Sequence, residues 1–538
     1  MGEEIGQTVK ISSITIMNHS RLPDCKLDVR DNLILVGPNG IGKSSLIRCL
    51  DMLLGKSIQQ LYYSISNSDF RDVNLPLCIE AQLTNLNSNE RSFFPDEVDL
   101  EDESLTVRLK ANLDGEDLTV SRFFPYGAAN TSVGSEQRKS IGWTMISSDF
   151  SAKSLAPGRR TLVDDYLKEI DASGDQYKLE AAINALSGAI NDSTAFTGAL
   201  NSLASTLNQA LESGVDDSKL RFVPGAAIEG NLLSDVRLEM EDKFGSMREV
   251  TEQSDGTKAL ISFAIFGLIN SSGIIAIDEP ETHLHPSAQR NLIEVLQSSG
   301  RQLIIATHSG AVASEFSPDN IAVMRESMSP AQPKVGFLKG RDEQKTLARW
   351  WISSRIELLT ARHIIAVEGQ SDRMVVERVA ELSGYHLKRD GIEILEAGSC
   401  NEMKPVMGIF GDNGFGKQIS ILVDEDAENE TANEQKNLTS VSMFVSRADL
   451  EDEYVSAIGA DALWEALRKS TLFTPNILKN CAISDGAVKP NEDELAEFCR
   501  HKKRKISCAI VACKLLDKTS AQRVSSVVKV LQNAVQVA

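Results

Sequence analysis

The chain has 538 residues, of which 42% are hydrophobic and 25% are charged, a composition that excludes a disordered or low-complexity protein. At roughly 150 residues per domain, this length predicts two to four domains. The formal net charge of −20 argues against a general nucleic-acid coat protein but leaves room for a local basic channel.

The sequence also disfavours a membrane protein and a protein built on disulfide bonds or CxxC motifs. It contains no apolar run of about 18 residues, so we expect no membrane-spanning helix, and the first residues carry no secretory signal. The eight cysteines form no CxxC pair, which disfavours a zinc ribbon or a thioredoxin motif. Sparse cysteines of this kind are typical of a reducing cytoplasm.

The first half of the chain alternates between strand-like and helix-like segments. Residues 33–36 form a short apolar run that predicts a buried strand, and a helix pattern begins shortly after it. Alternating stretches from about 75 to 125 predict antiparallel strands. From about 155 to 220, an Ala/Leu-rich pattern predicts a helical insertion, which could be an arm, a dimer surface or a plain core bundle. Strands are expected again near 222, at 273–280 and at 301–309.

A phosphate-binding loop lies between the first buried strand and its helix. The sequence GPNGIGKS at 37–44 fits the pattern GxxxxGK[ST]. In this pattern backbone N–H groups wrap the phosphates, the lysine reaches the β- and γ-phosphates, and the hydroxyl binds Mg²⁺. The sequence therefore predicts an ATP site formed by Gly37, Asn39, Gly40, Gly42, Lys43, Ser44 and Ser45.

Three later segments supply residues that suit ATP hydrolysis. Asp278 and Glu279 follow four apolar residues, so a strand end can deliver Asp278 to Mg²⁺ while Glu279 polarises the attacking water. Ser254 and Gly256 begin a helix and offer a hydroxyl and N–H groups to a γ-phosphate. His308 ends a further strand, from which it could touch the γ-phosphate.

This ordered set of motifs resembles the ABC-type ATPase heads of the SMC and RecF kind over about the first 325 residues. In such heads two copies sandwich ATP, so the resemblance implies that Ser254 and Gly256 act on the partner's P-loop. The sequence does not single out a Q-loop glutamine. Gln82 is one candidate, and the region 68–71 is the alternative position for this loop. His283 and His285 suggest either a metal pair or a dimer-contact loop, and their place just after Glu279 favours the loop.

The second half of the chain begins after a Ser-, Pro-, Gly- and Lys-rich stretch at 326–345, which we interpret as a linker. Strand and helix patterns then alternate as βαβαβ, which predicts a parallel, doubly wound sheet. The remainder, from about 450, is predicted to be mainly helical. Residues 500–538 contain nine Lys or Arg residues against one acid, Asp517, a hint of contact with a polyanion.

Acidic residues follow two of the predicted parallel strands. Glu368 ends one strand, Asp372 lies in the next helical turn, and Asp424 and Asp426 follow another strand. Because parallel strands deliver their carboxyl ends to one edge, these carboxylates should converge. Hard carboxylate oxygens favour Mg²⁺ or Mn²⁺ over zinc. The pattern VEG…DxD resembles the Toprim domain of topoisomerases, primases and some nucleases.

An ABC-type head followed by a Toprim domain resembles the OLD (overcoming lysogenization defect) family, which includes nucleases of Gabija defence and OLD-like retron effectors. The resemblance covers essentially the whole chain. It implies a metal site of Glu368, Asp372, Asp424 and Asp426, a later Glu that Glu451 fits with Ser446 nearby, and a late Lys. Lys505 fits that Lys best, in competition with Lys502, Lys503 and Lys514.

Together these patterns predict an α/β protein with an ATPase domain at 1–345 and a Toprim nuclease domain at 346–538, whose core spans about 361–460. The resemblance implies an antiphage DNA endonuclease that uses ATP with one Mg²⁺ and two Mg²⁺ or Mn²⁺ ions in the Toprim site. It also implies a homodimer or homotetramer, with a helicase or a reverse transcriptase and its RNA as a further partner. The alternatives are an ATP-driven DNA clamp with an inactive Toprim domain and an ATP-gated RNase.

Overall fold

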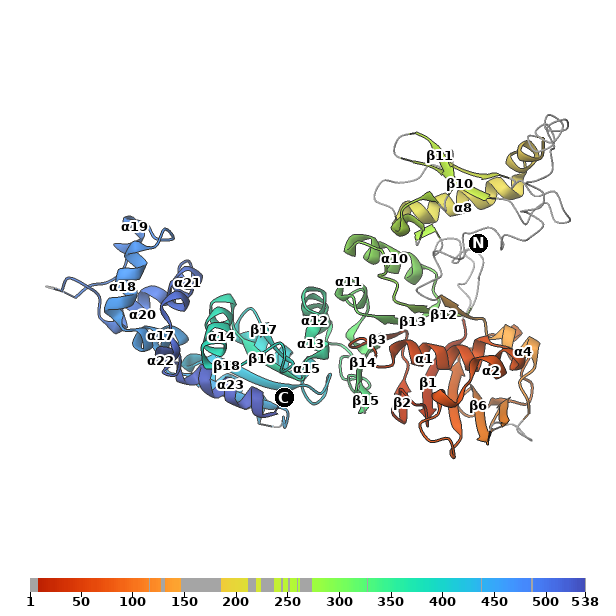
Figure 1. Ribbon diagram of the computed structural model, residues 1–538, viewed down its shortest axis with the longest axis horizontal. Coiled ribbons are helices and arrows are strands. Elements are labelled where there is room, and N and C mark those ends of the chain that lie inside the picture. Colours follow the sequence, from red (N-terminus) through yellow and green to blue (C-terminus); the bar gives the residue numbers. More distant parts are fainter. Residues whose placement is uncertain are drawn as a thin grey trace. The chain divides into compact units, whose positions relative to one another are not determined.

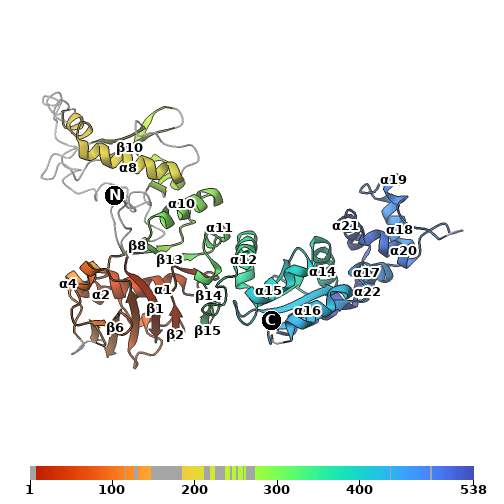
Figure 2. The same cartoon turned by 180° about the vertical axis from the view of Figure 1, so that it is seen from behind.

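The computed structural model describes two compact units (Figures 1 and 2). The first unit comprises Met1–Phe316 and Asn320–Pro330, and the second comprises Ser317–Asp319 and Ala331–Ala538. The described residues are 8–115, 117–126, 131–146, 185–210, 219–223, 237–242, 245–249, 252–258, 260–261, 273–326, 328–436, 438–484 and 487–537.

An antiparallel sheet forms one layer of the first unit. Its strand order is β2-β1-β4-β6-β5, and β7 also pairs with β6. Alternating burial along β4 shows that one side of this sheet packs on the core. These strands confirm the predicted antiparallel meander, and their bounds are β1 (Lys10–Met17), β2 (Cys25–Asp28), β4 (Leu77–Thr84), β5 (Val98–Asp99), β6 (Ser104–Asp114) and β7 (Asp117–Phe123).

A second sheet of the first unit has the order β15-β14-β3-β13-β12-β8. The neighbours from β14 to β8 pair in parallel. Its central strands are continuous apolar runs, as expected for a sheet that is buried on both faces. The bounds are β3 (Leu33–Val36), β8 (Trp143–Ile146), β12 (Ile274–Asp278), β13 (Gln302–Thr307), β14 (Ile321–Arg325) and β15 (Met328–Ala331).

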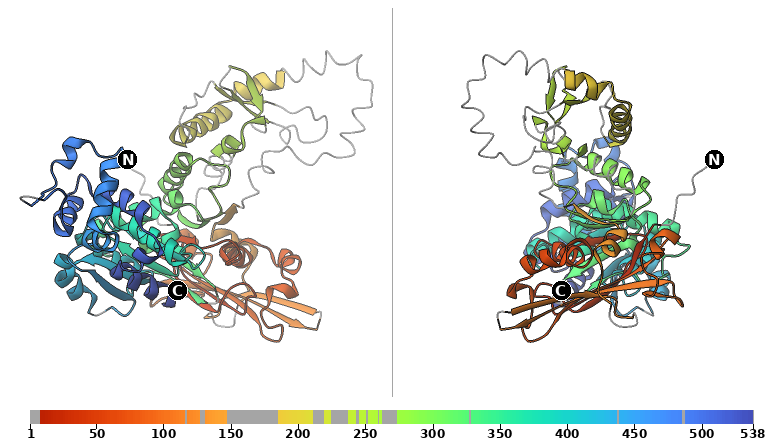
Figure 3. Two further views of the ribbon diagram at one scale, coloured as in Figure 1. Left: turned by 60° about the vertical axis from the view of Figure 1, so that its left-hand side comes forward. Right: turned by 90° about the vertical axis from the view of Figure 1, so that its right-hand side faces the viewer.

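Helix α1 (Lys43–Leu50) lies between the two sheets (Figure 3), where it packs against β12 and β13 on one side and β4 on the other. Leu46, Ile47 and Leu50 on this helix are fully buried. The P-loop therefore begins a helix that is held from both sides. The other helices of this unit are α2 (Ile58–Ser64), α3 (Ser88–Arg91), α4 (Ser135–Ser140), α10 (Pro286–Ser298) and α11 (Gly310–Ala313).

Much of the predicted helical insertion at 155–220 lies outside the described residues. Within the described part, helix α8 (Thr194–Ala210) has helical apolar spacing as predicted. It packs against β9 and shares a small core with Leu220 and Met240. The strands β9 (Leu220–Val223), β10 (Arg237–Glu241) and β11 (Met247–Glu249) form an antiparallel sheet in the order β11-β10-β9.

The second unit is built on a four-stranded parallel sheet with the order β17-β16-β18-β19. Because successive residues of β16 point to opposite faces and every one is buried, both faces of this sheet are covered. The doubly wound prediction is confirmed, although the strand β19 was not predicted. The bounds are β16 (His363–Val367), β17 (Ile392–Glu396), β18 (Gln418–Asp424) and β19 (Val441–Ser446).

The helices of the second unit share one hydrophobic core with this sheet. Helix α14 contacts α21, α22 and α23, and α23 packs on β16, β18 and β19. The basic C-terminal part is thus packed onto the four-stranded parallel sheet. The bounds are α12 (Asp342–Ser354), α13 (Glu357–Thr360), α14 (Gln370–Ser383), α15 (Met403–Phe410), α16 (Glu428–Gln435), α17 (Leu450–Ile458), α18 (Ala460–Lys469), α19 (Pro475–Leu478), α20 (Glu492–Arg500), α21 (Lys505–Leu515), α22 (Lys518–Ala521) and α23 (Ser525–Val537).

The segment predicted as a linker, 326–345, is more structured than expected. It contains β15 and the first residues of α12, and the two units divide at 330 rather than at 345. Its glycines mark turns, since Gly336 and Gly340 both have positive φ. In the described part of the chain, no helix is long and apolar enough to cross a membrane. All eight cysteines are free.

Candidate functional site

The P-loop is shaped by glycine. Strand β3 leads into it and α1 begins at Lys43. Gly42 has a φ of 107°, and a Cβ there would lie 2.6 Å from Cδ2 of Leu22 and 2.9 Å from the carbonyl oxygen of Arg21. A side chain is therefore excluded at Gly42 by both backbone conformation and space.

The Lys43 side chain is buried inside this loop. Its ammonium donates to the carbonyl oxygens of Gly37 at 2.8 Å and Pro38 at 3.0 Å, and it lies 2.9 Å from Nε2 of His308. Burial lowers the pKa of Lys43, and the nearby carboxylates of Glu279 and Asp278 partly offset this shift. The lysine is thus placed at the residues that were predicted to surround the γ-phosphate.

The predicted Mg²⁺ ligands of the ATP site meet at the end of β12. The hydroxyl of Ser44 donates to Oδ1 of Asp278 at 3.0 Å, and Nε2 of His308 lies 3.3 Å from Oε1 of Glu279. Burial raises the pKa of Asp278, while the Ser44 hydrogen bond lowers it. The structure therefore brings Lys43, Ser44, Asp278, Glu279 and His308 into one cluster.

A cavity of about 820 Å³ opens beside the P-loop. It is lined by the P-loop residues Asn39 and Gly40 and by the guanidinium-bearing residues Arg21, Arg71 and Arg325. Arginine side chains and P-loop residues in one lining suit a phosphorylated ligand. The predicted residues Gly37, Gly42 and Ser45 belong to the same loop and to the start of α1.

The signature-like residues lie elsewhere on the first unit. The Ser254 hydroxyl accepts from the N–H of Thr257 at 3.2 Å. A Cβ on Gly256 would lie 3.0 Å from the carbonyl oxygen of His283, in the loop after β12. Among the contacts of the described residues, none joins Ser254 or Gly256 to the P-loop of the same chain.

The alternatives for the Q-loop region have different outcomes. Gln82 lies in β4, where its amide nitrogen donates to Asp102 at 3.0 Å and to Ser104 at 2.9 Å, so its polar contacts are within the antiparallel sheet. In the segment 68–71, buried Asp69 pairs with Arg48 of α1 at 2.8 Å, and Arg71 lines the cavity. Residues 147–184, which follow β8, lie outside the described residues.

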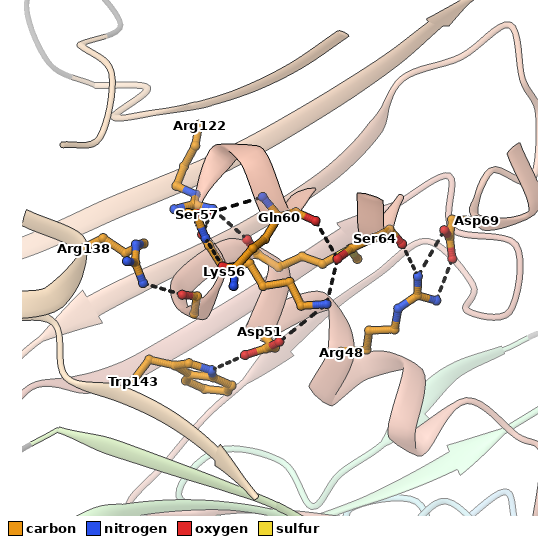
Figure 4. A network of polar contacts seen from close by, with 12 residues as sticks. Arg48, Asp51, Lys56, Ser57, Gln60, Ser64, Asp69, Arg122, Arg138 and Trp143 are labelled. Atoms are coloured by element: carbon orange, nitrogen blue, oxygen red, sulfur yellow. Dashed lines mark hydrogen bonds and ion pairs between the residues drawn. The ribbon is translucent and has the colours of Figure 1, made fainter. Parts of the chain in front are cut away.

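A polar network supports the C-terminal end of α1 (Figure 4). The helix continues as a π-turn, Asp51–Gly55, in which Asp51 accepts from the Trp143 indole at 3.1 Å. Arg122 donates to the carbonyl oxygens of Met52 at 3.0 Å and Lys56 at 2.5 Å. The P-loop helix is thereby tied to β7 and β8.

The carboxylates of the second unit converge on one amino group. Nζ of Lys505 lies 3.5 Å from Oδ1 of Asp372, 3.9 Å from Oδ2 of Asp424 and 3.5 Å from Oε2 of Glu451. Asp424 ends β18, Asp372 lies in the first turn of α14, Glu451 lies in the first turn of α17 and Lys505 begins α21. Four elements that are distant in sequence thus meet at one site. The strand-end argument predicted that Asp372 and Asp424 would converge, whereas Glu451 and Lys505 were implied by the family resemblance.

Glu368 and Asp426 are coupled to this cluster through their charges. The pKa of Glu368 is raised by burial and by the neighbouring charges of Asp372 and Asp426, and Lys505 opposes this shift. Asp426 lies in the short turn after β18 and is exposed. These couplings place both residues in the electrostatic field of the Lys505 cluster.

Burial dominates the electrostatics of the cluster. It raises the pKa of Asp424 to about 8 and that of Glu451 to about 7, against the opposing charge of Lys505. Burial alone would lower the pKa of Lys505, but Asp372, Glu451 and Asp424 hold it above its usual value. More acids than cations therefore share this pocket, which favours an added positive charge.

Two functional candidates were missed by the sequence analysis. Asp449, just before α17, raises the pKa of Asp424, and its own pKa is raised by burial. Arg500 pairs with Asp449 and, at 2.5 Å, with Asp452. The spacing Asp449-x-Glu451, which begins three residues after the end of β19, repeats the Asp424-x-Asp426 pattern and was the signal that could have identified Asp449.

The other late candidates take no part in the ion pairs of this cluster among the described residues. The hydroxyl of Ser446 lies 3.2 Å from that of Ser526 on α23. Lys502, Lys503 and Lys514 are exposed. Of the four lysines proposed from the resemblance, Lys505 is the one that forms ion pairs with Asp372 and Glu451 among the described residues.

The donor set fits a divalent metal ion, although it is not assembled around one. Both carboxylate oxygens of Glu451 are buried without a hydrogen-bond partner among the described residues, and the surrounding oxygens suit Mg²⁺ or Mn²⁺. Within the described residues, no three His, Cys, Asp or Glu side chains are arranged to share a metal ion. Lys505 stands between them instead.

Two family models match the chain. Residues 33–314 match a model described as "AAA domain, putative AbiEii toxin, Type IV TA system". Residues 359–426 match "Overcoming lysogenization defect protein-like, TOPRIM domain". The first match includes the P-loop and His308, and the second includes Glu368, Asp372, Asp424 and Asp426.

Known proteins are similar along most of the chain. "Old nuclease" of Escherichia phage P2 is 23% identical over 491 residues, which cover 80% of each chain. "Endonuclease GajA" of Bacillus cereus (strain VD045) is 22% identical over 423 residues, which cover 72% of this chain and 71% of that protein. The chain is also similar to a crystal structure of the Smc head domain from Pyrococcus furiosus bound to the C-terminal domain of ScpA. The alignment covers 60% of this chain and 95% of the Smc chain, with 14% identity and a TM-score of 0.39.

Proposed function

Because the chain belongs to the OLD family, in which an AAA domain is joined to a Toprim domain, we propose that it is an ATP-gated, metal-dependent DNA endonuclease. The nuclease and ATPase activities follow from the two domains and the named nucleases among its relatives. The observation that carries the proposal for the site is the convergence of Asp372, Asp424 and Glu451 on Lys505.

In this proposal Glu368, Asp372, Asp424, Asp426 and Glu451 would hold two Mg²⁺ or Mn²⁺ ions. Such ions, when bound, supply Lewis acidity and an activated water for phosphodiester hydrolysis. Asp449 adds negative charge next to this set, and Arg500 holds it in place. The Lys505 ammonium stabilises the negative charge that develops on the phosphate oxygens.

The basic loop, residues 500–505, would contact the DNA backbone. It joins α20 to α21, so it leads directly to Lys505 in the carboxylate cluster. Arg500 is paired with acids, whereas Lys502 and Lys503 are exposed. Exposed cations next to an acidic site offset its repulsion of phosphates.

The contribution of the basic loop can be measured by DNA-binding anisotropy in Ca²⁺ at several salt concentrations. We expect Lys502→Ala/Lys503→Ala to weaken binding and to reduce the salt slope by about two units. Lys518→Ala/Lys529→Ala removes the same charge from exposed positions of the later helices and serves as the matched control. Equal losses in both pairs would contradict a specific role of the loop.

In the ATPase domain, the cluster around Lys43 would bind the phosphates of ATP. Ser44 and Asp278 would hold its Mg²⁺, Glu279 would polarise the attacking water, and His308 would contact the γ-phosphate. Ser254 and Gly256 would complete the site of a second copy. In support, the contacts of these two residues among the described residues are with Thr257 and with the loop that contains His283, not with their own P-loop. We therefore expect ATP to drive dimer formation in the slow-hydrolysing variant Glu279→Gln, and Ser254→Arg to prevent it, as judged by light scattering.

A role in antiphage defence is the biological part of the proposal, and the similarity to "Endonuclease GajA" supports it. Expression of the chain with its genomic neighbours should reduce phage plating, and Asp424→Ala should restore it. Equal plating with the wild type and with Asp424→Ala would contradict this role.

The biochemical test is cleavage of plasmid, linear DNA and RNA in Mg²⁺ or Mn²⁺, with and without ATP. We expect DNA cleavage by the wild type, no cleavage by Asp424→Ala, and an altered ATP response in Lys43→Ala. ATP hydrolysis without cleavage of any substrate would support a DNA clamp instead, and cleavage of RNA alone would support an RNase.

A further inference from the structure

Two loops that follow neighbouring parallel strands are joined by one carboxylate. Glu281 lies in the loop after β12. Thr307 is the last residue of β13, and His308 follows it. Oε1 of Glu281 accepts from the N–H of His308 at 2.6 Å, and Oε2 accepts from the hydroxyl of Thr307 at 2.9 Å. Both oxygens of this carboxylate are therefore engaged by the segment that carries His308.

The same connection is closed on its other side by Gln289 of α10. Its amide oxygen accepts from the hydroxyl of Ser309 at 2.5 Å, and its amide nitrogen donates to the carbonyl oxygen of Leu284 at 2.8 Å. Thr307 is completely buried, and its hydroxyl oxygen also accepts from the N–H of Ser309 at 2.9 Å. The two loops thus form one hydrogen-bonded ring in which Glu281 supplies the negative charge.

These hydrogen bonds fix the position of the His308 imidazole relative to Lys43 and Glu279. The imidazole of His308 lies 2.9 Å from Nζ of Lys43 and 3.3 Å from Oε1 of Glu279. Glu281 touches the backbone of His308 and not its imidazole. A charged acceptor on a backbone N–H is a strong hydrogen bond, so it can fix the residue without entering the reaction.

We propose that Glu281 is a positioning residue for ATP hydrolysis, which holds His308 against Lys43 and Glu279 through the backbone of His308 and the hydroxyl of Thr307. This role rests on the proposed ATPase function of the first unit. It assigns to the second glutamate of the DEPE sequence (278–281) a task distinct from that of Glu279.

The test is steady-state ATP hydrolysis by the full chain. We expect Glu281→Gln to lower kcat about tenfold and to leave KM for ATP within about twofold, because ground-state binding of the phosphates by the P-loop is retained. Thr307→Val removes the second donor without changing the charge and should lower kcat in the same direction. Glu294→Gln, on the exposed side of α10, is the matched control and should behave as the wild type.

A double-mutant cycle with His308→Ala separates positioning from a general structural role. If Glu281 acts through His308, then Glu281→Gln will cost nothing further in the His308→Ala background. A full additional loss in that background would overturn the proposal, as would wild-type kcat in both Glu281→Gln and Thr307→Val. If the wild type hydrolyses no ATP, the proposed function fails together with this inference, whereas normal hydrolysis by the variants removes the inference alone.

Discussion

At the scale of single residues, Lys505 occupies the position where the acidic side chains of the second unit meet. Its ammonium lies within 3.9 Å of oxygens from Asp372, Asp424 and Glu451. A divalent ion bound by those oxygens would be repelled by this charge at short range. Lys505 therefore has two expected effects, since it assists the reaction and also competes with the metal.

Replacement of Lys505 by methionine should separate these effects. We expect Lys505→Met to lose cleavage but to bind Mn²⁺ about tenfold more tightly, because a nearby unit charge is removed. Mn²⁺ binding is measured by titration with detection of free ion, and Lys514→Met, exposed on the same helix, is the control. Weaker Mn²⁺ binding in Lys505→Met would show that the amino group does not stand in the place of the metal.

Asp449 provides a second test at this scale. It is buried enough for its pKa to be raised and is held by Arg500. We expect Asp449→Asn to weaken Mn²⁺ binding roughly tenfold, the effect typical of residues that support a metal site. Asp461→Asn, at an exposed position of α18, should have no effect. Unchanged Mn²⁺ affinity in Asp449→Asn would remove this residue from the site.

At the scale of elements, strand β16 depends on a buried histidine. Nε2 of His363 lies 2.9 Å from the hydroxyl of Ser420 on β18, and this hydroxyl donates to Oδ1 of Asn533 on α23 at 2.9 Å. The Ser420 oxygen is therefore the acceptor for His363, which places the proton of the neutral ring on Nε2. Burial lowers the pKa of His363 from 6.5 to about 4.

This shift predicts a pH-dependent stability with a defined sign. Since the folded-state pKa is the lower one, the unfolded chain binds the proton first as the pH falls. Stabilisation is complete above pH 6.5 and is lost between pH 6.5 and 4, by up to about 3 kcal/mol. In urea unfolding, His363→Gln should show a smaller loss of stability than the wild type over that range. Parallel pH profiles for the two proteins would contradict the buried neutral ring.

The π-turn after α1 is an element that requires a glycine. A Cβ on Gly55 would collide with the carboxylate of Asp51 and lie 2.9 Å from Cδ1 of Trp143. We expect Gly55→Ala to reduce the free energy of unfolding by about 1–3 kcal/mol through overpacking. Gly188→Ala, where no atom lies within 4 Å, is the control and should be neutral or slightly stabilising. Equal stability of Gly55→Ala and the wild type would contradict the packing around the turn.

At the scale of the whole molecule, the parts that sequence patterns could predict are those with short-range signals. The P-loop and the acids at the ends of β12, β16 and β18 depend on a continuous apolar strand followed by a polar residue, which is visible in the sequence. The same signal predicts the two sheets that contain parallel strands, one in each unit, and the convergence of Asp372 with Asp424. Family resemblance then supplied Glu451 and Lys505.

What the sequence could not predict depends on tertiary contacts. Strand β19 was missed because its sequence, VSMFVS, is only partly apolar. The D-x-E spacing at Asp449 is visible in the sequence, but its proximity to Asp424 and Arg500, which are distant in sequence, is known only from the fold. Gln82 was a candidate from residue type alone, and its hydrogen bonds lie within the first sheet. In the same way, the linker expected at 326–345 contains β15, since turn-forming residues mark tight turns as well as flexible segments.

The most direct measurement is nicking of supercoiled plasmid in Mn²⁺ by the wild type, Asp424→Asn and the control Asp461→Asn. If the carboxylates around Lys505 form the nuclease site, the wild type and the control will nick the plasmid, and Asp424→Asn will lose at least about 10²-fold in rate. Nicking by Asp424→Asn at the wild-type rate would contradict the assignment of the active site. The absence of nicking by the wild type on any DNA would contradict the nuclease function itself.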